Sequence, residues 1–251
     1  MFNKNAGLAA AFVMSINPWS IYMSRTAYES TPAILFYLLG FYLLLVLKGR
    51  KILFTIPVFF LAFYSYVGTK VSFLPFVFVL LVFSYFFVNK KKYLREYLIV
   101  FAASVLLVIV FAVSVFTTSG PSRVGELINF NHPEIAQEVD YIRKVSMQNP
   151  LTSVFENKVT IFSRILLTKL FKSFSFDYLF VYGDQFYSIL RHGFFYVFDA
   201  LFLVIGLAAA YAFKKRVFFL LLGLTLIGVL PQLLYSIRTD NFSIHLSLTF
   251  A

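Results

Sequence analysis

Ionisable side chains lie at the ends of long apolar segments of this chain. At membrane depth a charge is costly, so each of these side chains is a candidate site. Arg25 and Glu29 are four residues apart, so they share one face of a helix if the helix continues through them. A guanidinium can hold a phosphate through two hydrogen bonds, and a carboxylate can bind a divalent metal ion or act as a base. A mutual ion pair at the membrane surface explains the same spacing without any chemistry.

A second group surrounds Lys70, which ends a tyrosine-rich turn at 64–70 and has Tyr66 four residues before it. A lysine at this depth would pair well with a phosphate carried by a lipid. Alternatively, the side chain of Lys70 only reaches the lipid headgroups at the membrane surface and binds no substrate. Arg238 and His245 form a third group after the last apolar segment, and they complete the predicted substrate-binding set.

Metal and cofactor chemistry has little support in the residue pattern. No pair of histidines has the spacing of zinc ligands, and no phosphate-binding loop, dinucleotide fingerprint or nucleophile elbow is found. The chain has no cysteine, which excludes a disulfide and a thiol nucleophile. The residues therefore indicate no certain cofactor, and a divalent metal ion at Glu29 is the one candidate.

Apolar segments must position these groups, because 60% of the residues are hydrophobic, 13% are charged and the mean hydropathy is +0.83. Each segment has about 16–20 residues, close to the ~20 that cross a bilayer as a helix. We therefore predict an all-α, polytopic membrane protein with about seven transmembrane helices. The segments are 6–24, 32–47, 52–67, 71–88, 97–116, 194–213 and 217–235.

Charge placement predicts the orientation in a cell membrane. Eleven of the 22 basic residues lie in alternate short gaps between the segments, where Glu96 is the one acidic residue. The positive-inside rule places these gaps, and the N-terminus, in the cytoplasm. The net charge of +11 then reflects topology and not nucleic-acid binding, and anionic lipids are the expected partners of 90–92. The eleven are Lys4, Lys48, Arg50, Lys51, Lys90, Lys91, Lys92, Arg95, Lys214, Lys215 and Arg216.

The segment 117–193 lies outside the cytoplasm in this topology. Before it comes a five-helix transmembrane part, 1–116, and after it comes 194–251, which holds two further helices and the start of an outer loop. We predict that the segment 117–193 is folded and contains amphipathic helices. One begins at Pro133, and apolar residues follow at helical spacing. A second covers about 151–172 and lies in the membrane surface. The apolar stripe of this second helix consists of Val159, Phe162, Leu166 and Leu170.

Several motifs follow one another in an informative order. The segment 17–25, NPWSIYMSR, has a proline, an aromatic residue and then serine-arginine at a helix end, with Glu29 following. The tyrosine-rich turn, Lys70 and Pro75 come next, and the outer segment ends in FSFDYLFVYGD at 174–184. Together these motifs resemble the GT-C superfamily of polytopic glycosyltransferases, specifically the bacterial protein-mannosyltransferase and aminoarabinose-transferase-like group (glycosyltransferase family 39 and its relatives).

The resemblance implies transfer of a sugar from a polyprenyl-phosphate donor to a protein, lipid or glycan acceptor on the outer face of the membrane. Arg25 and Lys70 would stabilise the phosphate, and Glu29 matches an acidic position sometimes associated with metal. The family's catalytic aspartate lies in an outer loop upstream of the motif at Arg25, whereas five residues precede the first apolar segment here. We therefore expect an internal fragment that is inactive alone and whose catalytic residue is unknown.

Two other functional classes are consistent with the same residues. A polytopic transporter or lipid flippase would line its substrate path with Arg25, Glu29 and Lys70, and paired breaks in its helices would favour this class. An O-antigen ligase or polymerase also uses polyprenyl-linked glycans and would place basic residues in its large outer loop. A folded outer segment with a surface-lying helix suits an enzyme with a lipid-linked donor better than a transporter.

Reporter fusions test the predicted topology. Fusions after Arg50, Lys92 and Arg216 should report the cytoplasm, and fusions at Gly68 and Asn149 should report the outer face, because basic gaps stay inside. Reporter enzymes that are active on one side of the membrane only would give the answer for each site. A cytoplasmic signal at Asn149 would overturn the orientation.

Overall fold

The structure is a computed structural model that describes residues 4–87, 91–118, 133–146, 154–184, 192–235 and 246–250. Within these residues the chain forms eleven α-helices, together with short 3-10 and π-helical turns. Most of these helices are apolar along their whole length, as the composition requires. The prediction of an all-α fold is therefore confirmed.

Three helices in the described part of the chain are long and apolar enough to cross a membrane: α5 (Lys70–Phe87), α6 (Leu94–Thr118) and α11 (Lys215–Leu234). A fourth candidate joins α2 (Pro18–Arg25) to α3 (Ser30–Val46), with a bend of 117° between them. These helices indicate a membrane protein with three or four spans. The prediction of seven spans is wrong.

A polar cap inside the first apolar segment explains part of this difference. Asn17 begins α2: its Oδ1 accepts a hydrogen bond of 3.1 Å from the backbone N–H of Ser20, and Pro18 is the first helical residue. The cap separates α1 (Lys4–Ile16), which has only 13 residues. At 1.5 Å per residue such a helix is about 20 Å long, too short for ~30 Å of hydrocarbon.

Turns shorten two further segments. The segment 52–67 starts within a 3-10 turn, η1 (Gly49–Phe54), so that α4 (Thr55–Ser65) has 11 residues. The segment 194–213 starts as a loop, which leaves 15 residues for α10 (Asp199–Phe213). Hydrophobicity alone did not reveal these turns, because residues 52–54 and 194–198 are as apolar as the helices beside them.

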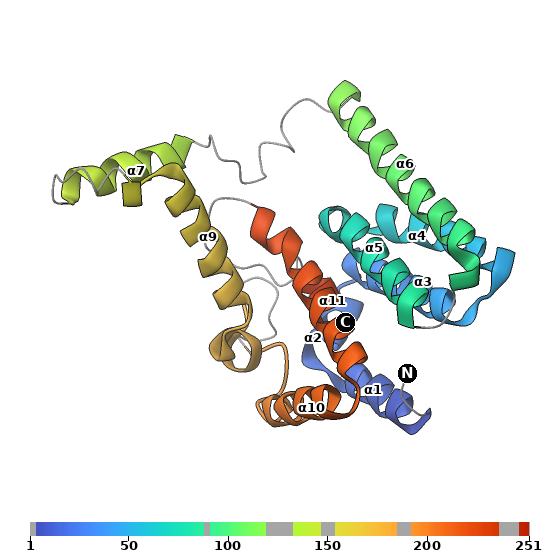
Figure 1. Cartoon of the computed structure of the whole chain (residues 1–251). Coiled ribbons are helices and arrows are strands. Elements are labelled where there is room, and N and C mark those ends of the chain that lie inside the picture. Colours follow the sequence, from blue (N-terminus) through green and yellow to red (C-terminus); the bar gives the residue numbers. More distant parts are fainter. Residues whose placement is uncertain are drawn as a thin grey trace.

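Helices α3 to α6 form a bundle on one side of the molecule, with α11 next to it (Figure 1). The helices of the outer segment, α7 (Pro133–Val145) and α9 (Lys158–Ser173), lie on the other side of α11 in this view. Tyr37 is central to the bundle: its ring packs edge to face on Phe76, with centroids 4.9 Å apart. Its hydroxyl donates a hydrogen bond of 3.2 Å to the carbonyl oxygen of Thr69, which joins α3 to the start of α5.

A proline inside α11 leaves one backbone carbonyl without its helical partner, and α5 replaces that partner. Pro231 has no N–H, so the carbonyl oxygen of Ile227 cannot accept the usual bond from four residues later. The Oγ of Ser72, a fully buried residue of α5, donates to this oxygen at 2.6 Å. The bond therefore connects α5 and α11 in an apolar environment, where an unpaired carbonyl would be costly.

The first helix of the outer segment agrees with its prediction. α7 begins at Pro133, carries Glu134 in its first turn and has Arg143 in its last turn, so its charges complement the helix dipole. Ile135 and Val139 are the buried residues of α7, and they lie on the face that the apolar spacing predicted. The domain boundaries at 117 and 193 stay a prediction.

The second outer helix starts later than predicted, at Lys158, because the side chain of Asn157 caps it by accepting a 3.0 Å hydrogen bond from the N–H of Thr160. A π-helical turn, η3 (Asp177–Tyr182), follows it. The buried face of α9 packs toward α7 and α11 and differs from the predicted apolar stripe, of which Val159 is 57% exposed. That the stripe lies in the membrane surface stays a prediction. The buried residues of α9 are Ile161, Ile165, Lys169 and Ser173.

Serine substitutions in α5 test the bond between the two spans. Ser72→Ala should lower the free energy of unfolding by about 1–3 kcal/mol, because it leaves the carbonyl of Ile227 unsatisfied. In a Pro231→Ala background this loss should shrink, because an alanine at that position restores the N–H that the carbonyl lacks. Thermal and denaturant unfolding in detergent would measure both values.

Ser84 provides the matched control on the same helix. It is also buried, but its Oγ makes no hydrogen bond within the described structure. Ser84→Ala should therefore be neutral or slightly stabilising. Equal losses for Ser72→Ala and Ser84→Ala would contradict the role assigned to Ser72.

Candidate functional site

Arg25 and Glu29 flank the bend between α2 and α3. α2 ends at Arg25, and α3 begins at Ser30 after a break of four residues. The helix axes differ by 117° across this break. The helix does not continue through Glu29, so the condition under which the two side chains would share a helix face is not met.

Backbone hydrogen bonds hold the bend in one conformation. The N–H of Tyr28 donates to the carbonyl of Met23, and the N–H of Ala27 donates to that of Ser24, both at 3.4 Å, which is the Schellman pattern. Ala27 has a φ of 52°, a left-handed conformation that costs a residue with a Cβ about 1–2 kcal/mol. Such strain often occurs at functional sites, here between two candidate binding residues.

Both candidate residues at the bend point away from the protein core. Arg25 and Glu29 are exposed, and these two described residues make no ion pair with each other. The mutual ion pair that could explain their spacing is therefore not found. Their charges remain accessible to a ligand on the surface of the bend.

Lys70, at the start of α5, lies against three aromatic rings. Its Nζ is 3.9 Å from the ring centre of Phe111, 5.4 Å from that of Phe63 and 5.6 Å from that of Tyr64. Each ring face attracts a cation by about 0.5–2 kcal/mol. The rings belong to α4 and α6. Lys70 therefore lies among aromatic rings at the start of α5, whereas Arg25 is exposed at the end of α2.

Tyr66 shapes the turn that positions Lys70. Its ring covers Gly68, where a Cβ would come within 2.6 Å of a ring carbon. Its carbonyl oxygen accepts a 3.1 Å hydrogen bond from the Oγ1 of Thr69. The observed role of Tyr66 is thus to order the turn, and its contact with a substrate stays a prediction.

Two segments from distant parts of the sequence pack together beside the bend. The backbone N–H of Trp19, in the segment 17–25, donates to the carbonyl of Phe194 at 3.3 Å. The N–H of Phe195 donates in turn to the carbonyl of Leu179, in η3, at 3.0 Å. One buried cluster contains the side chains of these elements and of α11. Its buried members are Trp19, Met23, Ile34, Leu179, Phe180, Phe194, Val229 and Leu246.

A small pocket of about 280 Å³ opens at this junction. Gly193 makes the close packing possible, since a Cβ at this position would lie 2.3 Å from the backbone of Phe180. His192 and Pro18 lie on the pocket wall together with aromatic residues. The junction therefore combines a polar histidine with an apolar cavity at the start of α2.

A buried carboxylate lies near the same junction and was not among the predicted site residues. Asp184 is 6% exposed and follows Gly183, whose φ of 63° ends η3. Burial, with a further contribution from the charge of Asp184, raises the pKa of Tyr178 well above its usual value. The ring of Tyr178 packs edge to face on Phe194 at 5.0 Å. The Gly183-Asp184 pair in the sequence was the signal that could have identified this carboxylate.

The remaining predicted site residues lack structural tests. Arg238 and His245 lie outside the described residues, although the next residue, Leu246, is buried in the junction cluster. No group of three or more histidine, aspartate or glutamate side chains gathers in the part of the chain that is described. A metal ion at Glu29 therefore stays a prediction.

Lys169 connects α9 to α11 and was not predicted from the sequence. It is fully buried, and its Nζ donates hydrogen bonds to the carbonyl oxygens of Tyr235, at 2.6 Å, and Gln232, at 3.4 Å. These carbonyls end α11, where a cation also complements the helix dipole. Burial lowers the pKa of Lys169 to about 8. The four-residue spacing of Ile161, Ile165 and Lys169 was the signal for its buried position.

Comparisons with known proteins give no relative for this arrangement. No protein-family model, no curated protein and no solved structure matches the chain. The site must therefore be interpreted from its own residues and from the motifs that they form.

The stability of the protein should depend on the protonation of Lys169. Between pH 8 and 10 the folded protein loses this proton before the unfolded chain does, so the free energy of unfolding should rise with pH. The rise is bounded by about 1.4 kcal/mol per unit of pKa difference, and the accepting carbonyls reduce it. Chemical unfolding in detergent at several pH values would measure it.

Lys169→Met and Lys172→Met form a matched pair for this test. Lys172 is exposed on the same helix, so its substitution should leave the pH dependence unchanged. Lys169→Met should abolish the rise, because methionine does not titrate. An unchanged rise in Lys169→Met would assign it to another group.

Proposed function

We propose that this chain forms the membrane part of a glycosyltransferase. It would move a sugar from a polyprenyl-phosphate donor to a protein, lipid or glycan acceptor on the outer face of the membrane. The packing of segment 17–25 against η3 and Phe194 carries this proposal. Segment 17–25 and η3 belong to the motifs that resemble the GT-C superfamily, and their convergence is what one shared binding site requires.

Arg25 provides the contact with the donor phosphate in this proposal. Its guanidinium is exposed at the bend, is always charged and has the planar fork that matches two phosphate oxygens. The first turn of α3 follows within the same bend and contributes the positive end of a helix dipole. The polyprenyl chain would lie along the apolar helices while its phosphate remains at the bend.

Transfer requires stabilisation of the phosphate as its bond to the anomeric carbon of the sugar breaks. Charge then builds on the phosphate oxygens, and fixed cations lower the energy of that state. Arg25 supplies one cation, and Lys70 is the second predicted one. Glu29, exposed on the other side of the bend, would bind a divalent metal ion or accept the proton of the acceptor hydroxyl.

A transporter or lipid flippase is a second candidate function, because α2 and α3 together form a broken span with a bend of 117°. Transporters use such discontinuous helices to expose half-helix ends to a substrate. They commonly contain a matching break in a second structural repeat. Within the described residues a single broken span is found, so we prefer the enzyme.

Binding of a polyprenyl-phosphate sugar to the full chain in lipid nanodiscs tests the proposal. Arg25→Ala should weaken binding about 10–100-fold, since a charge-assisted hydrogen bond contributes about 1.5–3 kcal/mol. Arg25→Lys should restore only part of the affinity, because an ammonium cannot reproduce the two parallel bonds. Lys48→Ala, which removes an exposed cation outside the site, is the control.

The outcomes separate the two functions. A glycosyltransferase should bind the donor more tightly than the bare polyprenyl phosphate, because it must recognise the sugar. Movement of the donor across proteoliposome membranes, abolished in Arg25→Ala, would favour the flippase instead. Equal binding by the native chain and Arg25→Ala would leave Arg25 as a structural anchor only.

A further inference from the structure

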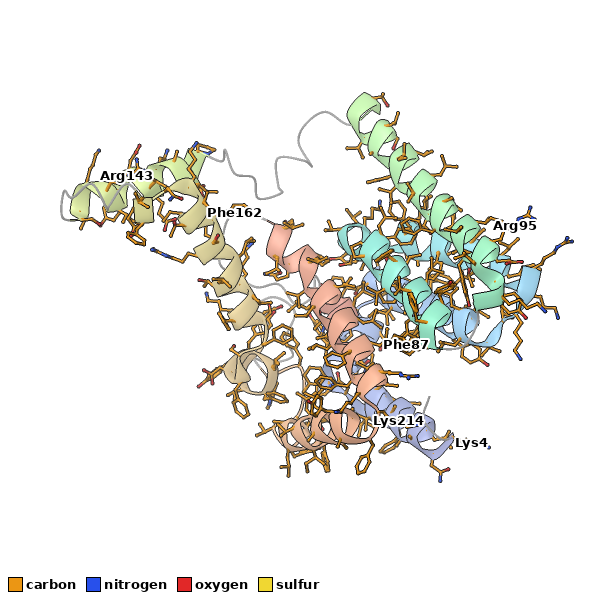
Figure 2. The ribbon with its side chains drawn as sticks, in the orientation of Figure 1. Lys4, Phe87, Arg95, Arg143, Phe162 and Lys214 are labelled. Atoms are coloured by element: carbon orange, nitrogen blue, oxygen red, sulfur yellow. The ribbon has the colours of Figure 1, made fainter. Side chains whose placement is uncertain are left out.

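A pocket of about 900 Å³ lies where the ends of α3, α5 and α10 meet the turn into α11. Figure 2 shows Phe87 at the end of α5 and Lys214 at that turn, on the same side of the molecule as Lys4. The pocket is thus a gap between the α10–α11 turn and two helices of the bundle. Its walls are formed by Tyr42, Leu45, Val46, Phe83, Phe87, Ala212, Phe213, Lys214, Lys215, Arg216 and Val217.

One end of this pocket is strongly basic. Lys214, Lys215 and Arg216 are consecutive and exposed, and none of the described lining residues is acidic. The Cζ of Arg216 lies 5.2 Å from the ring centre of Phe87, and the Nζ of Lys215 lies 5.3 Å from that of Tyr211. An aromatic ring orients a cation without cancelling its charge, so Lys215 and Arg216 retain their attraction for an anion.

The position of these cations on α11 also favours an anion. Lys214 is the N-cap residue and makes no side-chain cap, while Lys215 and Arg216 occupy the first turn, which contains no acidic residue. The N-terminus of a helix is the positive end of its dipole, so cations there are unfavourable on their own. An anion in the pocket would be stabilised by both the dipole and the side chains.

The basic end continues into an apolar channel. A neighbouring pocket of about 380 Å³ shares Phe83, Phe87, Lys215 and Arg216 with the first and extends along α5 and α11. Phe78, Val82 and Phe219 line this extension and are exposed. Cations at one end and an apolar channel behind them match a ligand that has an anionic head and a hydrocarbon tail.

We propose that this site binds one anionic phospholipid of the cytoplasmic leaflet. Its phosphate contacts Lys215 and Arg216, and one acyl chain lies in the channel between α5 and α11. We assign the cytoplasmic leaflet because Lys214, Lys215 and Arg216 are consecutive cations in a short turn, which the positive-inside rule favours in the cytoplasm. The bound lipid fills the gap between the α10–α11 turn and α3. A zwitterionic lipid binds less tightly, because its own cation lies next to the basic cluster.

Native mass spectrometry of the full chain, released from nanodiscs of mixed phosphatidylglycerol and phosphatidylcholine, tests this site. The native chain should retain one phosphatidylglycerol. Lys215→Ala/Arg216→Ala should lower its retention by about tenfold or more, because both headgroup contacts are lost. Lys48→Ala/Arg50→Ala removes the same charge from another basic gap and should leave retention unchanged. Val82→Trp should also lower retention of phosphatidylglycerol, because the larger side chain narrows the channel. This variant tests the site independently if the double variant fails to fold.

Three results would overturn the proposal. Equal losses in the two double variants would indicate a general attraction of lipids to positive charge. Equal retention of phosphatidylcholine would remove the requirement for an anionic head. Complete displacement of the lipid by millimolar inorganic phosphate would show a site for free anions.

Discussion

Backbone groups in an apolar environment must find hydrogen-bond partners, and this requirement determines how the helices of this protein end and meet. Pro231 removes the helical partner of Ile227, and the Oγ of Ser72 takes its place at 2.6 Å. The last carbonyls of α11 meet the same requirement through Lys169, whose Nζ lies 2.6 Å from the carbonyl oxygen of Tyr235. Both connections use α11, which therefore joins the bundle of α3 to α6 to the outer helices.

The bend at Arg25 depends on packing elsewhere. The left-handed Ala27 costs about 1–2 kcal/mol, and the hydrogen bonds from Ala27 and Tyr28 offset only part of this cost. Trp19 and Met23, in the helix before the break, are 2% and 1% exposed. Burial of large apolar side chains contributes about 1.5–3 kcal/mol each, so the junction cluster can hold the strained bend and the exposed Arg25 in place.

The sequence predicted the fold class and α7 correctly, but it did not predict the number of membrane spans. The all-α fold followed from composition, and α7 followed from the order of Pro133, Glu134 and the apolar spacing. The number of spans was overestimated, because Asn17 and the 3-10 turn before Thr55 interrupt apolar segments that hydropathy treats as continuous. The buried face of α9 was not predicted, because it contains Lys169, and the carbonyls at the end of α11 that accept its hydrogen bonds are distant in the sequence. At the site, single residues were recognisable, whereas the packing of Phe194 and Leu179 beside segment 17–25 joins residues that are distant in the sequence.

An excess of cations shapes the chemistry of both proposed sites. The chain has 22 basic and 11 acidic residues, so many cations cannot be matched by carboxylates. The ion pair found among the described residues joins Arg164 to Glu156 at 3.8 Å. Elsewhere Lys70 and Arg216 lie over rings, and Lys169 meets carbonyls. Rings and carbonyls hold a cation in place without removing its net charge. Exposed cations held in this way, unlike those in ion pairs, keep their affinity for phosphate groups, which lipids carry to both faces of a membrane.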